Sequence, residues 1–282
     1  MKKSFYDRRR DFNNFAVFAV TGVCASAVLG VLLYILGFLW VHGIAAVNWD
    51  FFTKLPKPVG EIGGGMANAL VGSAKLLALA GLVGLPIGLF SGIYLSEYGH
   101  NAFSDAVRFM TDILNGVPSI VIGIFVYTLV VLPMKKFTAL AGGVSLGVMM
   151  IPIAVRTTEE FLKLVPHTVR EAALALGVPR WKIILRVVLP TAMRGVVTGI
   201  LLDFARVAGE TAPLLFTAFG NRYWSRGLLE PTSSLPVMIY TYAVSPYEDW
   251  HRQAWAAGLV LLTLVFTVGA LARTVLKKPV AL

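Results

Sequence analysis

Uncharged runs of apolar residues recur along the chain at lengths that match the thickness of a lipid bilayer. A hydrocarbon core of roughly 30 Å needs about 20 apolar residues in helical form. Five such runs occupy residues 16–40, 76–95, 113–133, 139–155 and 254–272. A sixth run, residues 195–219, is apolar apart from Asp203, Arg206 and Glu210. The pattern predicts an all-α membrane protein with six transmembrane helices.

The segments between these runs predict how the chain is organised. Residues 1–15 form a polar, basic arm, residues 16–44 a peripheral first helix, and residues 67–276 a core of five helices. Within the core, we expect residues 156–192 to form a long cytoplasmic loop. Residues 220–253 form an outside segment, part of which folds back as a short helix.

A row of glycines in the second run predicts close helix packing. Gly84, Gly88 and Gly92 follow each other at four-residue spacing, so they share one face of a helix. Small residues on such a face allow two membrane helices to approach closely.

Composition excludes an ordinary soluble domain. Hydrophobic residues make up 57% of the chain and charged residues only 14%, whereas a soluble domain carries about 25% charged residues.

The net charge of +10 is explained by orientation in a membrane. With the N-terminus inside, 16 of the 25 Lys and Arg residues fall in inside segments and 7 in outside segments, which leaves Lys75 and Arg206 within spans. Membrane proteins concentrate basic residues on the cytoplasmic side. The distribution predicts cytoplasmic N- and C-termini and no nucleic-acid partner.

The most informative stretch lies in the predicted cytoplasmic loop. Thr168 and Glu171 have the spacing of a capping box, and the residues that follow Glu171 are strong helix formers. Gly177 suits the end of a helix, Pro179 the start of the next, and Pro190 its end. We therefore expect two short helices joined by a glycine turn. Such a knob can dock in a groove of a soluble partner or rest on lipid headgroups, and the residues alone leave both open.

Three charged residues interrupt the sixth apolar run. At 100° per residue, Asp203, Arg206 and Glu210 lie within about 60° of one another on a helix. Arg206 and Glu210 can pair at i,i+4. Ionisable groups inside a membrane usually face a cavity or each other, and the planar fork of Arg suits an oxyanion. The cluster is either part of a substrate pathway or an ion pair that fixes the bundle.

A second candidate site lies early in the third run, at Asn115, Gly116 and Ser119, with Pro118 between them. Pro118 removes a backbone hydrogen bond, and freed amides can bind anions. A simple proline kink explains the same residues.

Other charged residues near the spans have ordinary explanations. We expect Lys75 to extend toward the outer interface, Asp112 to be solvated near the inner interface, and Glu159 and Glu160 to lie on a solvated face.

The loop resembles the EAA loop of ABC-importer permeases. The matching residues are Glu171, Ala172, Ala173, Gly177, Val187, Leu189 and Pro190, with Val187 in the place of the usual Ile. The resemblance implies a MetI-like (type I) permease fold. It also implies that this loop forms a coupling helix that inserts into an ATPase subunit, with those roles for Glu171, Ala172, Ala173, Gly177, Leu189 and Pro190.

Two further segments resemble phosphate-specific (Pst) permeases, and the likeness covers about residues 68–275. One runs from Arg206 to Leu215 and contains R-x-x-G-E-T-A-P-L-L; the other runs from Gly116 to Gly123. The Ala-Pro-Leu-Leu ending is similar to the A-type subunit of the permease pair. The resemblance implies a role in phosphate passage for Arg206 and Glu210, and less directly for Asp203. The other expected pathway residues are Asn115, Gly116, Ser119 and Thr211.

The resemblance also implies the partners. They are a second, PstC-type permease, two PstB-type ATPases and a PstS-type phosphate-binding protein, assembled in a bacterial inner membrane. The sequence contains no G-x-x-x-x-G-K-[ST] loop, so ATP and Mg²⁺ are expected to act in the partner ATPase, with no cofactor on this chain and no catalysis by it alone. The alternatives are a permease for sulfate or molybdate, a membrane signalling subunit that transports nothing, and, less consistent with the residues, an intramembrane enzyme.

Overall fold

The computed structural model describes residues 5–61 and 63–275. These residues form helices joined by loops, with isolated β-bridges between Pro56 and Gly64 and between Phe219 and Thr232. The predicted all-α fold class is confirmed. The terminal basic residues Lys2, Lys3, Lys277 and Lys278 lie outside the described residues, as does residue 276 at the end of the predicted core.

Within the described residues, five helices are long and apolar enough to cross a membrane, and one bent pair of helices brings the number to six if the pair is counted as one span. The long helices are α1 (Phe5–Gly43), α3 (Ala67–Glu97), α7 (Ala139–Lys163), the continuous helix made of α9 (Arg180–Ile183), η3 (Ile184–Val188) and α10 (Leu189–Ala208), and α13 (Glu248–Val275). The bent pair is α4 (Ala102–Gly116) followed by α5 (Ser119–Val126), η2 (Tyr127–Val131) and α6 (Leu132–Met134). The shorter elements are η1 (Ile44–Ala46), α2 (Trp49–Thr53), α8 (His167–Ala175), α11 (Ala212–Thr217) and α12 (Leu235–Ala243).

Helices α3 and α7 form the centre of the bundle, and small residues set their separation. The glycine row on α3 consists of Gly84, Gly88 and Gly92, which lie against Gly147, Ala154 and Thr158 of α7. A Cβ atom at any of the three glycines would overlap α7 atoms. The close packing predicted from the glycine spacing is confirmed, and we call this contact the α3–α7 seam.

Apolar clusters line the bundle from one end to the other. The central cluster includes Leu76 and Ala80 of α3, Leu146 and Met150 of α7 and Leu214 of α11. A second cluster joins α12 to α13 and contains the stacked rings of Tyr242 and Trp250, whose centroids are 4.3 Å apart. A third surrounds the start of the α9–α10 helix.

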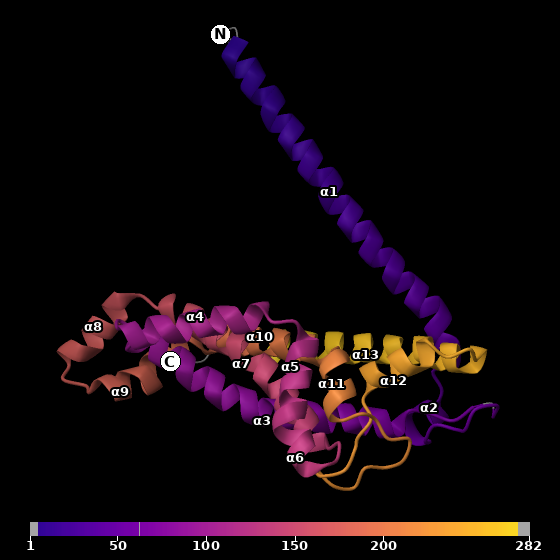
Figure 1. Cartoon of the computed structure of the whole chain (residues 1–282). Coiled ribbons are helices and arrows are strands. Elements are labelled where there is room, and N and C mark those ends of the chain that lie inside the picture. Colours follow the sequence, from indigo (N-terminus) through magenta and orange to yellow (C-terminus); the bar gives the residue numbers. More distant parts are fainter. Residues whose placement is uncertain (1–4, 62, 276–282) are drawn as a thin grey trace.

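Helix α1 stands away from the other helices at a steep angle (Figure 1). Most of its side chains are exposed, and the packing is concentrated at its C-terminal end. There Gly43 lies against Trp255 and Leu259 of α13, and the rings of Phe38 and Trp255 meet edge to face with centroids 5.3 Å apart.

The prediction of one continuous helix over residues 113–133 is wrong. Helix α4 starts before that run, at Ala102, and ends at Gly116, and the axis turns by 104° before α5 continues the chain. Val117 between them is extended, with φ −73° and ψ 128°. The ring of a proline disfavours the helical conformation in the residue before it, so Pro118 breaks the helix completely.

The expectation that Pro190 ends a short helix is also wrong, because the helix from Arg180 passes through Pro190 to Ala208. A proline ring inside a helix clashes with the carbonyl four residues earlier and lacks an N–H donor. Here the π-helical turn Ile184–Val188 ends two residues before Pro190, and this turn widens the helical backbone. The same arrangement recurs in the other half of the chain, where the π-helical turn Tyr127–Val131 precedes Pro133.

The helix predicted over residues 195–219, the sixth apolar run, both starts and ends earlier than expected. It ends at Ala208 with Gly209 as its C-cap, and α11 follows after a short break. Pro213 cannot donate the backbone hydrogen bond that would continue the helix across Gly209, so the chain restarts as a separate short helix.

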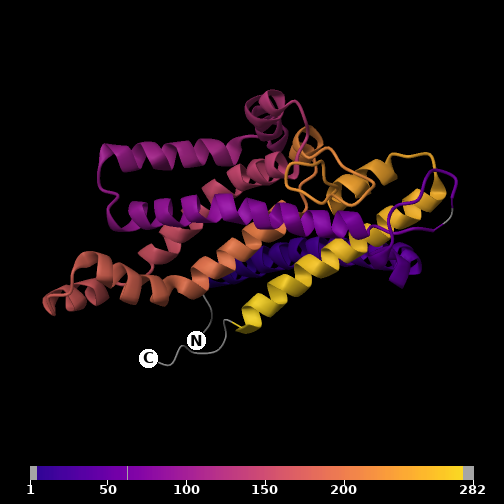
Figure 2. The same cartoon turned by 90° about the horizontal axis from the view of Figure 1, so that it is seen from below.

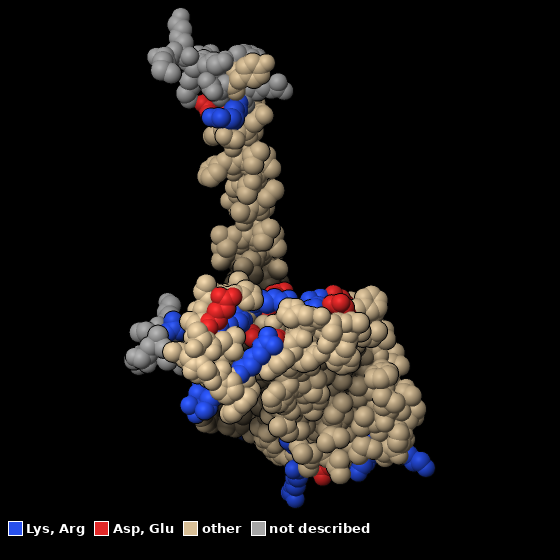
Figure 3. All heavy atoms as spheres, turned by 90° about the vertical axis from the view of Figure 1, so that its left-hand side faces the viewer, with Lys and Arg blue, Asp and Glu red and all other residues tan. Residues whose placement is uncertain are grey.

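The bundle has two distinct ends (Figures 1 and 2). Helices α8 and α9 lie at one end, which we call the α8 end, and α12 and α2 lie at the other, which we call the α12 end. Figure 3, a view onto the α8 end, shows that charged side chains gather there, whereas the shaft of α1 is tan along most of its length.

The α3–α7 seam gives a direct prediction for stability. Gly88→Leu is expected to destabilise the purified protein by about 1–3 kcal/mol, because the added side chain must displace Ala154. The measurement is the midpoint of thermal unfolding in detergent.

The control for this prediction is Gly22→Leu in α1, where a Cβ meets no atom within 4 Å. Equal changes in the two variants would show that the seam does not limit stability.

Candidate functional site

Helix α8 presents nearly all of its surface outward. Arg170 and Ala173, three residues apart, are only partly exposed and face the bundle, whereas Glu171, Ala172 and Leu174 are exposed. Gly177 follows the helix with φ +74°, a conformation that favours glycine, and its N–H bonds to the Leu174 carbonyl at 2.9 Å. The predicted glycine turn is confirmed.

The predicted capping box at the start of this helix is wrong. Helix α8 begins at His167 with Pro166 as its N-cap residue and without a side-chain cap hydrogen bond. Thr168 therefore lies inside the first turn, where its side chain cannot cap the helix, and Glu171 projects from the exposed face. Glu171 thus has no capping partner in Thr168, and its carboxylate is available on the surface of α8.

The remaining residues of the resembling loop lie further along the chain. Leu189 is partly exposed and Pro190 is exposed, and both belong to the first turn of α10. The loop therefore joins one short helix, α8, to a membrane-length helix, so a displacement of α8 acts on α10 through the turn at Gly177 and through the packing of Ala173 on the start of the α9–α10 helix.

A network of ion pairs, which the sequence analysis missed, joins the helices at the α8 end. The expectation that Glu159 lies on a solvated face is wrong, because it is 1% exposed. Its carboxylate accepts from Arg108 of α4 at 2.8 Å and from Lys163 at 2.6 Å. Lys163 stands four residues after Glu159, and that spacing was the sequence signal that pointed to a pair.

Arg108 binds two helices at once. Besides Glu159 of α7, its guanidinium donates to the carbonyls of Leu95 (3.0 Å) and Gly99 (3.1 Å) at the C-terminal end of α3. Asp112, expected to be solvated, is exposed but pairs with Arg156. These contacts fasten α4 to both central helices.

The predicted cluster of Asp203, Arg206 and Glu210 does not lie on one helical face. Arg206 is exposed in the last turn of α10, and Glu210 lies beyond the end of that helix and is partly exposed. The i,i+4 pairing expected of Arg206 and Glu210 is therefore wrong, because it requires a helix that continues through Gly209. Among the described residues, the ion pairs within 4.0 Å do not include either side chain.

Asp203 lies in the interior instead. It is 1% exposed, and neither carboxylate oxygen has a hydrogen-bond partner within the described part of the chain. One turn earlier on α10, Gly199 packs against Thr157 of α7. A buried carboxylate without a partner is costly.

The two broken segments meet in space. Gly123 of α5 lies directly against Pro213 of α11, so closely that a Cβ at Gly123 would overlap the proline. Ser119 lies one helical turn before Gly123, and Thr211 comes directly before α11. The structure thus brings together two segments about 90 residues apart in sequence, and Arg206 lies in the last turn of the helix that precedes α11. Asn115 and Gly116 are exposed at the end of α4, before the 104° bend.

Lys75, which we expected to extend toward the outer interface, binds the loop at the α12 end. Its ammonium donates to the carbonyls of Ser225 (2.9 Å) and Gly227 (3.4 Å). In the same loop, hydrogen bonds from the backbone N–H groups of Arg226 and Gly227 to the carboxylate lower the pKa of Glu230. Also at this end, α12 is the short helix predicted within residues 220–253.

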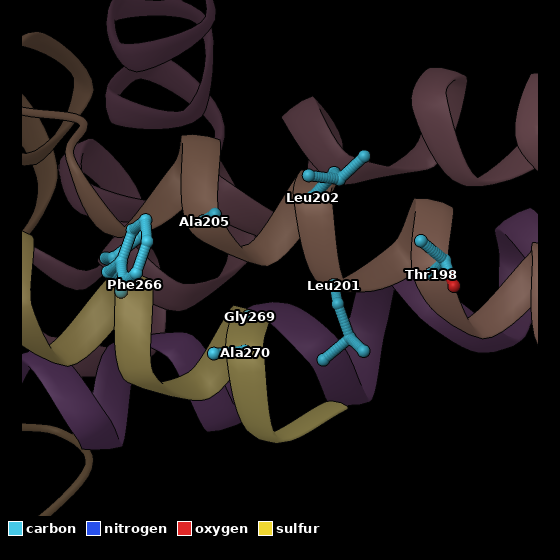
Figure 4. A pocket seen from close by; sticks show the side chains of 8 residues that line it. Thr198, Leu201, Leu202, Ala205, Phe266, Gly269 and Ala270 are labelled. Carbon is cyan, nitrogen blue, oxygen red and sulfur yellow. The ribbon is translucent and has the colours of Figure 1, made fainter. Parts of the chain in front are cut away.

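A groove between α10 and α13 is unsuited to an anion. It measures about 370 Å³ and lies between α10 and α13, with Leu201, Leu202 and Phe266 among its walls (Figure 4). The hydroxyl of Thr198, its polar side chain, already donates to the Arg194 carbonyl at 2.7 Å. Its lining matches lipid or another apolar helix.

Comparison with known proteins identifies similar chains. The model of the family described as binding-protein-dependent transport system inner membrane component matches residues 84–279. A phosphate transport system permease protein PstA of Xylella fastidiosa (strain 9a5c) is 47% identical over 276 residues, which cover 96% of this chain and 94% of the relative. The corresponding protein of Yersinia pestis is 45% identical over 248 residues, 88% of this chain and 84% of the relative.

Solved structures support the fold at low sequence identity. A bacterial alginate ABC transporter chain, in complex with an alginate-bound periplasmic protein, superimposes with a TM-score of 0.66 at 13% identity and covers 99% of this chain and all of that one. A chain of the inward-facing MetNI methionine ABC transporter gives a TM-score of 0.60 at 21% identity over 75% of this chain and 96% of its own. These likenesses establish the MetI-like architecture.

The unpartnered carboxylate of Asp203 gives a test of stability. Asp203→Asn is expected to raise the free energy of unfolding by about 1 kcal/mol, because the neutral amide removes the cost of burying a carboxylate charge without a partner. The measurement is the thermal unfolding midpoint in detergent.

The matched control is Asp112→Asn, which removes a paired carboxylate and is expected to give no rise. A lower midpoint for Asp203→Asn would mean that the carboxylate is stabilised where it lies.

Proposed function

Because this chain belongs to the family of binding-protein-dependent inner membrane transport components, and within it to the PstA phosphate transport permeases, we propose that it forms one half of a phosphate pathway driven by a separate ATPase. The chain is a multi-pass membrane protein and a non-catalytic permease subunit of an ABC transporter. The partners proposed for it are a PstC-type permease, two PstB-type ATPases and a PstS-type phosphate-binding protein.

The exposed face of α8 is the observation that carries the coupling role. Glu171, Ala172 and Leu174 are exposed, although α8 is itself fixed to the bundle through its inner face. A short, anchored helix with a free outer face suits insertion into a groove of a soluble protein. The α8 end then faces the cytoplasm, together with both termini, in agreement with the excess of basic residues on that side.

The pathway is proposed to run beside the two broken segments. Arg206 is exposed in the last turn of α10, shortly before α11 in the chain, and its planar guanidinium can hold phosphate oxygens bidentately. In a complex of two permeases, this surface faces the partner permease across the pathway. Glu210 and Thr211 lie in the break between α10 and α11, where a small change of backbone angle moves them relative to Arg206.

Alternating access follows from these two regions. A binding protein delivers phosphate at the α12 end, Arg206 neutralises the anion briefly, and the carboxylate of Glu210 weakens its binding so that the ion can leave. Closure of the ATPases on ATP moves α8 and reverses the side to which the pathway opens. The alternative of a sulfate or molybdate permease has no support among the relatives compared, and a signalling subunit without transport does not explain an exposed arginine in a span.

The pathway role predicts the effect of removing the arginine. In the assembled complex reconstituted in lipid vesicles, Arg206→Ala is expected to lower ATP-driven phosphate uptake at least about tenfold, because the anion loses its only proposed cationic partner on this chain. Uptake of labelled phosphate is the measurement, and co-purification shows that the complex still assembles.

The control for this measurement is Lys136→Ala, an exposed lysine in the turn before α7 at the α12 end. Normal uptake by Arg206→Ala would refute the pathway assignment.

The coupling role predicts the effect of a charge on α8. Ala172→Asp is expected to reduce the amount of ATPase that co-purifies in detergent at least about tenfold, because a carboxylate would be buried in the docking groove. Ala243→Asp, on the exposed side of α12, is the matched control. Undiminished retention of the ATPase by Ala172→Asp would contradict docking through α8.

A further inference from the structure

Arg170 is the side chain through which α8 is bound to the core of the bundle. Its guanidinium donates to the Glu97 carboxylate at the last residue of α3, with Nη2 to Oε1 at 2.7 Å and Nε to the two oxygens at 3.2 and 3.3 Å. It also donates to the carbonyls of Leu162 (2.8 Å) and Val165 at the C-terminal end of α7. One side chain thus links α8 to the ends of both seam helices.

These contacts are buried, although they lie at the surface end of the bundle. The side chain of Glu97 is 5% exposed and that of Arg170 is 14% exposed. Burial weakens screening by water, and several hydrogen bonds to one planar group fix its orientation. The last carbonyls of a helix have no partner one turn further along the helix, so groups at the end of α7 can accept from Arg170. The Leu162 carbonyl also accepts from the Val165 N–H at 3.2 Å.

The remaining attachment of α8 is weaker and directed elsewhere. Ala173, the other inward residue of α8, packs in the apolar cluster around Ile183 and Val188, at the start of the α9–α10 helix. That contact joins α8 to the helix that follows it in the chain. Arg170 alone supplies the described polar bonds from α8 to α3 and α7.

Arg108 shows the same design with the two seam helices exchanged. Arg108 of α4 binds a carboxylate of α7, Glu159, and carbonyls at the end of α3, whereas Arg170 of α8 binds a carboxylate of α3 and carbonyls at the end of α7. Each arginine ties a peripheral helix to the C-terminal ends of both seam helices. Arg108 acts on the helix that leads to the broken segment at Gly116, and Arg170 acts on the helix with the free docking face.

We propose that Arg170 and Glu97 are positioning residues that make α8, α3 and α7 move as one body, so that displacement of α8 by the ATPase is transmitted to the seam helices. The proposal rests on the proposed coupling function and adds the route of transmission within this chain. Without the ion pair, the ATPase still docks on the outer face of α8 and still hydrolyses ATP. Helix α8 then rotates about the Gly177 turn, and its displacement is not transmitted to α3 and α7.

The test uses the complete complex in lipid vesicles and measures phosphate taken up per ATP hydrolysed. Glu97→Gln keeps the size of the side chain but removes its charge and one of the two oxygens that accept from Arg170, and Arg170→Gln removes the guanidinium. Each is expected to lower the ratio at least about fivefold, while ATP hydrolysis stays within about twofold and the ATPase remains bound. In the double variant the two losses are expected not to add, since both remove the same contact.

Arg170→Lys is the conservative variant. Lysine keeps a charge opposite Glu97 but cannot also reach both α7 carbonyls, because it donates from a single nitrogen, so an intermediate ratio is expected. This variant decides the question if Arg170→Gln fails to fold, because its buried carboxylate stays paired. Lys163→Gln is the control at the same end, since Lys163 binds Glu159 and does not contact α8 through a described bond.

Three results would overturn the proposal. They are an unchanged ratio in Glu97→Gln, a fall of uptake and hydrolysis in the same proportion, and loss of the bound ATPase, which would make Arg170 a docking residue. Failure of the proposed function itself is distinguishable, because the wild-type complex would then show no ATP-driven phosphate uptake.

Discussion

The close approach of α3 and α7 is the constraint on which the rest of the structure depends. In lipid, apolar side chains gain little by leaving the solvent, so helices associate through dense packing of small residues. The α3–α7 seam satisfies this requirement at Gly84, Gly88 and Gly92. It gives the bundle one stiff pair of helices whose C-terminal ends are linked at the α8 end, and the other functional parts are attached to that pair.

The attachments differ in kind at the two ends of the bundle. At the α8 end, Arg108 and Arg170 bind buried carboxylates and helix carbonyls, which makes these joints strong and directional. At the α12 end, Lys75 holds a loop through backbone carbonyls. Between them, prolines interrupt the helices near the proposed pathway. The arrangement suits a transporter in which a partner displaces the rigid α8 end and the pathway opens by movement at the helix breaks.

Features that depend on composition and residue spacing were predicted correctly from the sequence. The positions at which helices break or continue were not. Six crossings, the glycine seam and the turn at Gly177 followed from apolar length, four-residue spacing and glycine chemistry. The break at Gly209 was missed because Pro213 acts on a hydrogen bond four residues earlier, which hydropathy does not register, and the expected pairing of Arg206 with Glu210 failed with it. Conversely, Pro190 was expected to end a helix, because a compensating π-helical turn has no sequence signature. Glu97, the carboxylate partner of Arg170, and Arg108, the arginine partner of Glu159, lie 73 and 51 residues away, so only the fold could reveal these two pairs.

The most direct test of this account is a distance measurement between α8 and α3 in the assembled complex. With Cys24, the only cysteine, replaced by Ser, spin labels are placed at Leu176 after α8 and at Leu82 on α3, which are 82% and 73% exposed. Pulsed electron resonance then compares the nucleotide-free complex with the complex trapped by ATP and vanadate. The account predicts the same narrow distance distribution in both states, because α8 and the seam move together. A shift of about 5 Å or more between the states, one helical turn, would contradict it.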